Sequence, residues 1–429
     1  MHPNLSFEQA PPLSVPFRFV LTAPLFGVAA GLLLLVQGGD MLASRWTPGA
    51  LAATHLMAVG FMLQAMCGAL LQFVPVAAGG NIWRPRLVAG FVHPLLAAAA
   101  VLLAAAFLTQ RPALFFAAAL GFALALGAYI LVVGIALSRR DARGTTITAL
   151  RIALAGLLVT LLLGVTLATG VARGSDFPFL TLTSIHAAWG LGGWALILLA
   201  GVSYYVVPMF QLTPAYPIWL ARGVPWMLLA VLLLWSAQLV GFPDGVRVAL
   251  LLGGFGVAGL FAAATLYLQS RRRRKLSDTT LLFFRTAMLC LLVTLLSVLL
   301  FALQPALWED PRAAVWLGVL LLVGVFASAI SGMLYKVVPF LIWLHLQRLC
   351  GPNTLPPTMN LMIPARAMRR HFHTHIGALI ILLLASVGWP SLARAAGLAF
   401  ALDCAWLGLN LVAAVRVFFA FRNRIRAGV

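Results

Sequence analysis

The sequence predicts an all-α integral membrane protein with twelve transmembrane helices, and three observations carry this prediction. First, 63% of the 429 residues are apolar and only 9% are charged, whereas a soluble domain has about 25% charged residues. Second, the apolar residues form long runs, and a helix needs about 20 of them to cross a bilayer. Third, three of these runs share a repeated pattern. The composition excludes soluble globular, disordered and disulfide-stapled proteins.

The predicted helices are separated by short segments rich in glycine, proline and arginine. No segment is long enough for a separate soluble domain, so residues 1–429 are predicted to form one polytopic membrane domain. The longest connection, 341–372, is predicted to be a loop, and the polar leader 1–14 predicts no cleaved signal peptide. The twelve predicted spans are residues 16–37, 50–77, 87–109, 113–137, 147–172, 181–208, 222–242, 247–270, 281–304, 313–340, 373–393 and 395–418.

The net charge of +20 predicts contact with the headgroups of a lipid bilayer and no nucleic-acid binding, because the basic residues lie in short loops between apolar runs. Twelve spans place both ends of the chain on the same side of the membrane. Basic residues accumulate in cytoplasmic loops, so both termini are predicted to be cytoplasmic. Only six of the 29 basic residues fall on the opposite side: Arg45, Arg111, Arg173, Arg247, Arg312 and Arg394.

Three of the predicted helices end in related strings. Residues 68–75 read Gly-Ala-Leu-Leu-Gln-Phe-Val-Pro, residues 201–208 read Gly-Val-Ser-Tyr-Tyr-Val-Val-Pro, and residues 332–339 read Gly-Met-Leu-Tyr-Lys-Val-Val-Pro. The prolines are 133 and 131 residues apart, which corresponds to four spans each time. A further glycine lies fifteen residues before each proline, at Gly60, Gly193 and Gly324.

This repeat favours three pseudo-symmetric four-helix units, approximately 16–137, 147–270 and 281–418, around a threefold axis. Glycines at such spacings let a helix approach a neighbouring helix or a flat ligand closely. The Val-Pro ending predicts that each helix stops at the cytoplasmic face. A simpler alternative is that the glycines serve helix packing alone.

The string His55-x4-Gly60-x7-Gly68-x5-Val74-Pro75 resembles the second-helix signature of subunit I of the haem-copper oxidases. It is most similar to their short relatives, the NnrS-like membrane proteins associated with nitric oxide and with haem-copper metabolism. The continuation 76–85, which contains Gly79 and Gly80, is also similar. The resemblance covers the whole chain in architecture but only the second helix in motif. It implies haem b and copper as cofactors and a bacterial inner membrane as the location.

The resemblance also implies roles for two histidines. His55 occupies the position of a haem ligand, and His186 lies on the sixth span, from which the oxidases supply a copper ligand. The alternative for His55 is a hydrogen bond to a backbone carbonyl group or to Thr54. His55 precedes its proline by 20 residues and His186 by 22. Because two residues rotate a helix by about 200°, the two are not equivalent unless a bulge intervenes.

The oxidases also require histidines on the seventh and tenth spans, and here both spans have none. The resemblance therefore does not extend to a complete oxidase with its binuclear centre.

A second histidine group, His371, His373 and His375, lies at the cytoplasmic side of the eleventh span. In a helix His371 and His375 share one face, and this spacing can chelate a divalent or cuprous ion. His93 and His345, on the same side of the membrane, could approach them. The alternative is an interfacial cluster that contacts lipid headgroups.

Asp403 and Lys336 are ionisable residues within predicted spans. A charge in hydrocarbon costs at least about 2.5–3.5 kcal/mol, so Asp403 should face the bundle interior and have a partner there. Asn410 follows one heptad later on a similar face. Lys336 can extend to the cytoplasmic interface, and its counterparts in the repeat are Gln72 and Tyr205, which makes this layer polar in all three units.

The sequence thus favours a haem- or copper-binding inner-membrane protein that takes part in nitric oxide, metal or haem handling. Its partners would be respiratory-chain or nitric-oxide-related proteins. One alternative is a secondary transporter of a small solute or metal ion that uses Asp403 and the second histidine group. Another is an assembly factor for a respiratory complex. The sequence leaves open whether the protein is an enzyme.

Overall fold

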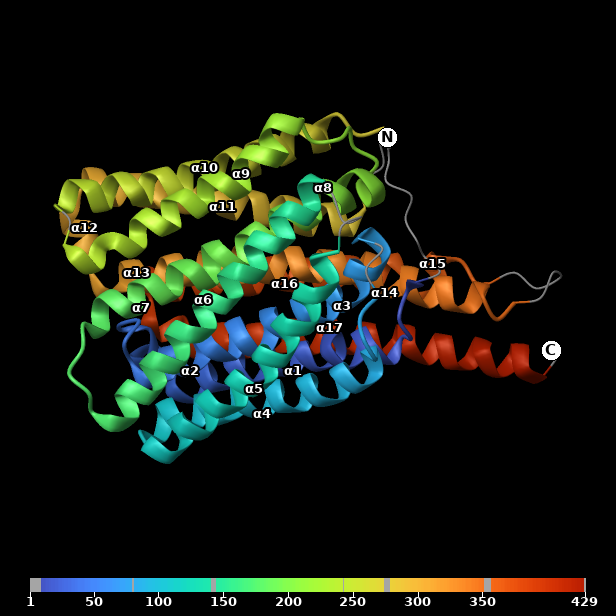
Figure 1. Ribbon diagram of the computed structural model, residues 1–429, viewed down its shortest axis with the longest axis horizontal. Coiled ribbons are helices and arrows are strands. Elements are labelled where there is room, and N and C mark those ends of the chain that lie inside the picture. The colour runs from blue at the N-terminus through green and yellow to red at the C-terminus, as the bar shows by residue number, and fades with distance from the viewer. Residues whose placement is uncertain are drawn as a thin grey trace.

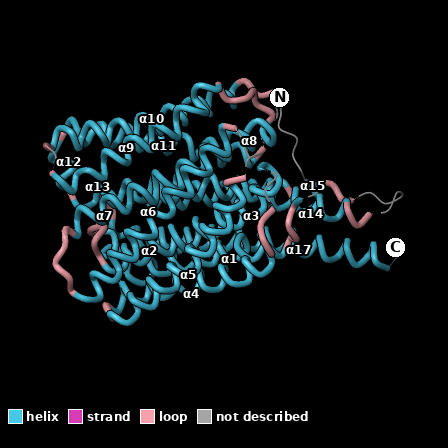
Figure 2. The backbone as a smooth tube through the Cα atoms, viewed as in Figure 1, coloured by secondary structure: helices cyan, strands magenta, loops and turns pink. Residues whose placement is uncertain are grey.

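The computed structural model describes residues 9–78, 81–139, 144–241, 243–273, 278–350 and 356–427. Within these ranges every regular element is a helix (Figure 2). Twelve helices are long and apolar enough to cross a membrane, which confirms the predicted all-α multi-pass class and the number of spans. Gly79 and Gly80, which follow the first repeat string, lie outside the described residues.

The spans follow one another as antiparallel helices with short connections. Each of the second, sixth and tenth spans consists of two α-helices with a π-helical segment between them. In order, the spans are α1 (Ser14–Gln37); α2 (Pro48–His55), η3 (Leu56–Met62) and α3 (Leu63–Ala78); α4 (Pro85–Thr109); α5 (Pro112–Leu137); α6 (Thr145–Arg173); α7 (Phe179–Ala188), η4 (Trp189–Leu196) and α8 (Ile197–Gln211); α9 (Ile218–Ser236); α10 (Asp244–Ser270); α11 (Thr279–Leu303); α13 (Pro311–Val319), η6 (Leu320–Ala327) and α14 (Ser328–Gln347); α16 (Ala365–Val387); and α17 (Ala393–Ala427). Short helices η2 (Gly38–Leu42), η5 (Ala237–Val240), α12 (Pro305–Glu309), α15 (Met359–Met362) and η7 (Pro390–Leu392) lie between spans.

The predicted loop 341–372 is largely wrong. The tenth span continues to Gln347 and the eleventh already begins at Ala365. The prediction that Val-Pro ends each repeated helix is also wrong, because α3, α8 and α14 all continue beyond their prolines. A proline removes one helical hydrogen bond, and inside a bundle neighbouring groups can replace that bond.

The spans lie side by side along the long axis of the molecule (Figure 1). The first helix, α1, packs along the last, α17, so the two ends of the chain close the bundle. With an even number of spans, the start of α1 and the end of α17 lie at the same end of the bundle (Figure 1).

The three repeated spans also share their packing. In each of them, both repeat glycines contact the first helix of the same predicted unit, because a side chain in place of the glycine hydrogen would meet that helix. Gly60 and Gly68 lie against Phe26 and Phe19 of α1, Gly193 and Gly201 against Gly156 and Ala149 of α6, and Gly324 and Gly332 against Cys290 and Phe283 of α11. The repeat therefore has a common local role in helix packing, while the superposition of whole four-helix units stays a prediction.

Replacement of Gly156 by Ala is expected to lower the free energy of unfolding by about 1–3 kcal/mol. A Cβ atom on Gly156 would lie 2.5 Å from the main-chain carbonyl carbon of Gly193, and backbone cannot move aside as a side chain can. Thermal unfolding in detergent measures the effect. Gly377→Ala on α16 is the matched control, because a Cβ there meets no atom within 4 Å. Equal stability of the two variants would contradict this account.

The C-terminal halves of the three repeated spans, together with α1, line a cavity of about 170 Å³. Its walls are almost entirely apolar and come from α1, α3, α8 and α14. Gln72 and Tyr205, which the repeat places at equivalent positions, both line it. The polar layer predicted from the sequence is thus part of a cavity wall in the first two units.

Candidate functional sites

His55 and His186 come together from two different units. His55 is the last residue of α2 and His186 lies on α7, and their ring centres are 6.5 Å apart with the planes inclined by only 18°. The ring of His55 also packs against Phe107 of α4, at 4.9 Å between centres. The imidazole of the first unit therefore faces the second unit.

Both rings are oriented by backbone carbonyl groups. Nδ1 of His55 donates to the carbonyl oxygen of Leu51 at 2.8 Å, and Nδ1 of His186 donates to that of Thr160 at 3.1 Å. In the described part of the chain Nε2 of either ring has no hydrogen-bond partner, so it carries a free lone pair. An Nδ1–H group held by a carbonyl oxygen is the arrangement that orients histidine ligands of metal ions. Gly164 of α6 makes room for the ring, because a Cβ atom there would lie 3.0 Å from Cε1 of His186.

A π-helical segment follows each histidine, η3 after His55 and η4 after His186. Both segments begin 19 residues before the proline of their repeat string, at Leu56 and at Trp189. Because the segments occupy equivalent positions, they do not remove the two-residue offset, and His55 and His186 come from different positions of the repeat.

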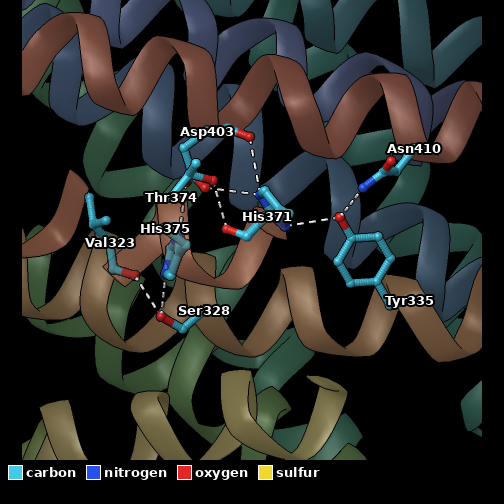
Figure 3. A network of polar contacts seen from close by, with 8 residues as sticks. All are labelled: Val323, Ser328, Tyr335, His371, Thr374, His375, Asp403 and Asn410. Carbon is cyan, nitrogen blue, oxygen red and sulfur yellow. Dashed lines mark hydrogen bonds and ion pairs between the residues drawn. The ribbon is translucent and has the colours of Figure 1, made fainter. Parts of the chain in front are cut away.

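The second site is a buried network around Asp403, which comes from α17 (Figure 3). His371 and His375 lie on one face of α16 and are both 1% exposed, while Asp403 is 3% exposed. Nδ1 of His375 donates to Oδ2 of Asp403 at 2.8 Å. Nε2 of His371 donates to the main-chain oxygen of Asp403 at 3.1 Å and lies 2.9 Å from its Oδ1. The predictions that these histidines share a face and that Asp403 points inward to a partner are confirmed.

Two further side chains extend the network on the His371 side. The hydroxyl group of Tyr335 on α14 donates to Nδ1 of His371 at 2.9 Å, and Asn410 donates its amide hydrogen to the same hydroxyl oxygen at 2.7 Å. Asn410 thus shares the face of Asp403, as its spacing predicted. The tyrosine links α16, α17 and the tenth span through a single oxygen atom.

On the His375 side the network ends on the tenth span. The hydroxyl oxygen of Ser328 lies 2.8 Å from Nε2 of His375 and 3.2 Å from the carbonyl oxygen of Val323. Val323 belongs to the π-helical segment η6, and Ser328 is the first residue of α14. This hydroxyl group therefore connects the buried carboxylate with the π-helical turn.

The four histidines predicted to bind a metal do not come together. His373 is on the exposed face of α16, and His93 is hydrogen-bonded to Thr22 of α1 at 2.9 Å. His345 is bonded to the carbonyl oxygens of Leu341 and Pro11. Nowhere in the described ranges do three or more His, Cys, Asp or Glu side chains form a group that could hold a metal ion. The histidines of α16 are engaged in hydrogen bonds, and the predicted contact with lipid headgroups is excluded for His371 and His375 by their burial.

Lys336 has a partner that the sequence did not indicate. Its Nζ lies 2.9 Å from Oδ2 of Asp278, which precedes α11. Asp278 also caps α11 by accepting from the backbone N–H of Leu281, and it accepts from the Thr280 hydroxyl group. Burial raises the pKa of the Asp278 carboxyl group, but the hydrogen bonds from Lys336 and Thr280 outweigh burial and hold this pKa below its ordinary value.

Replacement of Asp278 by Ala is expected to lower the free energy of unfolding by about 1–2 kcal/mol, because both the helix cap and the ion pair are lost. Asp278→Asn keeps a capping side chain and should cost less than about 1 kcal/mol. Since the folded-state pKa of Asp278 is depressed, its stabilisation is present above the unfolded pKa of about 3.9 and is lost as the pH falls through the folded value. Chemical unfolding at several pH values measures this. Identical stability of wild type and Asp278→Asn near neutral pH would contradict a contribution from the ion pair.

No family model and no curated protein sequence matches this chain. The fold and its sites define a multi-pass helical membrane protein with two separate histidine sites between its helices. One site is a pair of imidazoles with free Nε2 atoms, and the other is a hydrogen-bonded network around a buried carboxylate.

Proposed function

We propose that this protein binds a metal centre, haem iron or copper, between His55 and His186. The observation that carries the proposal is the facing pair of imidazoles, each with Nδ1 bonded to a carbonyl oxygen and Nε2 free. Imidazole nitrogen suits both iron and copper. On this proposal the protein handles nitric oxide, haem or metal in a bacterial inner membrane, with cytoplasmic termini and respiratory-chain or nitric-oxide-related partners, and it is not a complete oxidase.

The separation of the rings fits such a centre. Two imidazoles on opposite sides of one ion have nitrogens about 4 Å apart, at roughly 2.0 Å per metal–nitrogen bond. Their ring centres are then about 6 Å apart, since each centre lies roughly 1 Å behind its nitrogen. The observed 6.5 Å is close to this value.

When bound, the metal would supply a redox-active or diatomic-binding centre. The chain itself holds two nitrogen ligands in place and keeps them in the tautomer that offers Nε2. Phe107 covers one face of His55, and Gly164 leaves the space that the ring of His186 occupies. These contacts reduce the freedom of both rings before a metal binds.

The test is an absorption spectrum and a metal analysis of the purified protein, expressed with haem and copper supplied. The proposal expects about one haem or one copper per chain, lost in His55→Ala and in His186→Ala. His373→Ala is the matched control. Because His373 lies on the exposed face of α16, this substitution should leave the haem and copper content per chain unchanged. Absence of both haem absorbance and stoichiometric copper from the wild-type protein would refute the proposal.

A second candidate function, transport of a small apolar solute, is favoured by the cavity between the repeated spans. Gln72 lines this cavity, is only 7% exposed, and its Oε1 has no hydrogen-bond partner among the described residues. A solute with an apolar body and one hydrogen-bond donor would satisfy that oxygen. Uptake by proteoliposomes that disappears in Asp403→Asn and persists in His55→Ala would favour this candidate over the metal centre.

A further inference from the structure

The buried network around Asp403 contains one carboxyl group and two imidazoles that contact it. A carboxylate in a membrane interior requires a counter-charge, since an isolated ion there is costly. Asp403 has its ionic contacts only with His371 and His375 in the described part of the chain. If the carboxylate is ionised, one of these two imidazoles must therefore carry the balancing proton.

The other charged groups on the surrounding helices are engaged elsewhere or exposed. Lys336 of α14 pairs with Asp278, Arg285 of α11 donates to the carbonyl oxygen of Gln269, and Arg18 of α1 donates to that of Ser14. The arginines of α16, Arg366, Arg369 and Arg370, are exposed, as are Asp40 of η2 and Arg312 of α13. The remaining titratable groups nearby are Tyr335, which contacts His371, and two cysteines: Cys404 beside Asp403, with its sulfur against Gly27 of α1, and Cys290 of α11, which lies against Gly324 of η6.

The partners of each ring indicate which one carries the balancing proton. Nε2 of His371 donates to Asp403, and Nδ1 of His371 is the one acceptor within reach of the Tyr335 hydroxyl hydrogen among the described residues, because the Tyr335 oxygen itself accepts from Asn410. His371 is therefore neutral, because one nitrogen donates and the other accepts.

His375 is in a different position. Its Nδ1 donates to Asp403 at 2.8 Å, a length typical of a charge-assisted hydrogen bond. The carbonyl oxygen of Val323 already accepts the backbone N–H of Ser328, so the Ser328 hydroxyl hydrogen can point either to that oxygen or to Nε2 of His375. Since His371 is neutral, the proton that balances an ionised Asp403 lies on His375, whose Nε2 then donates to the Ser328 oxygen.

We propose that Asp403 and His375 form a proton-binding site, in which one proton is held as a buried imidazolium–carboxylate pair and the Ser328 hydroxyl group reports its presence to the tenth span. With the proton bound, Ser328 donates to the Val323 carbonyl oxygen. When Nε2 of His375 loses its hydrogen, the same hydroxyl group turns to donate to Nε2, and the Val323 oxygen loses that bond.

This switch lies next to the central cavity. Ala329 and Ile330, which follow Ser328 directly, are part of the cavity wall. Val323 lies in η6, which contacts the corresponding segment η3 of the second span. Gain or loss of one proton at His375 therefore acts on the tenth span where it borders both the cavity and the first unit. The proposal is independent of a metal at His55 and His186.

The experiment is nitrogen-15 NMR of the full-length protein in lipid nanodiscs, with labelled histidine and with the His375 signals assigned by loss in His375→Gln. At about pH 7 the proposal expects both His375 nitrogens to carry hydrogen in the wild type. Asp403→Asn should leave one His375 nitrogen bare. Ser328→Ala, which removes a hydrogen bond to a charged group, should lower the ratio of doubly to singly protonated His375 at least about tenfold. The matched control, His373→Gln, should change nothing.

Three results would overturn the proposal: a bare nitrogen on His375 in the wild type, a doubly protonated His375 in Asp403→Asn, or an unchanged ratio in Ser328→Ala. Ser328→Ala removes only one hydroxyl group, so it keeps the test decisive even if Asp403→Asn does not fold. A carbon-13 label on the Val323 carbonyl group should shift with the protonation of His375, and a signal independent of it would refute the switch.

Discussion

Asp403→Asn is expected to lower the free energy of unfolding by about 3–5 kcal/mol, among the largest effects of any single substitution in this chain. The carboxylate is 3% exposed and is approached by imidazole nitrogens of His371 and His375 at 2.9 and 2.8 Å. Removing its charge takes away the counter-ion of the His375 imidazolium, so this ring must give up its proton, and the hydrogen bonds between charged groups are lost. Unfolding by denaturant in mixed micelles measures the loss.

A double-mutant cycle separates the pair from other effects of the substitution. His375→Gln removes the same interaction from the other side. The loss of unfolding free energy in the double variant should therefore be smaller than the sum of the two single losses, by about 0.5–3 kcal/mol. Asp176→Asn, at an exposed position, is the control and should change stability by less than about 0.5 kcal/mol. Strict additivity of the two single variants would contradict a buried Asp403–His375 pair.

His55→Ala and His186→Ala are each expected to weaken metal binding more than about 100-fold, because each removes a ligand and not merely a group that orients one. If the two rings share one ion, the double variant should bind no more weakly than either single variant, apart from residual non-specific binding. Equilibrium titration of the purified variants measures this. Two independent sites would instead lose one equivalent of metal per substitution and two in the double variant, which contradicts a shared ion.

Much of the fold could be predicted because membrane spans are encoded locally, in length and hydropathy. All twelve were predicted, and the main errors lie around 341–372, where polar and basic residues continue helices beyond the hydrocarbon region. The inward position of Asp403 followed from the cost of burying a charge alone. The repeat strings correctly indicated close helix contacts at Gly60, Gly193 and Gly324.

The partners within each site could not be predicted in the same way. Ser328, Tyr335 and Thr160 are common residue types with no distinctive spacing, and their roles depend on which helices become neighbours. The π-helical segments that follow His55 and His186 have no sequence signature that we recognise. The pair Lys336–Asp278 joins residues from two different spans, so neither residue alone identifies the other. Helical spacing shows that His371 and His375 share a face, but not that a carboxylate and two hydroxyl groups lie within hydrogen-bond distance of their nitrogens.

The most direct test of the proposed metal centre is a titration of the purified apoprotein, separately with haemin and with cuprous ion, with His55→Ala/His186→Ala in parallel. The account predicts saturation of the wild type at about one equivalent of one of these ligands and no saturable binding in the double variant. It would be contradicted if the wild type bound neither ligand, or if the variant that lacks both imidazoles bound as tightly as the wild type.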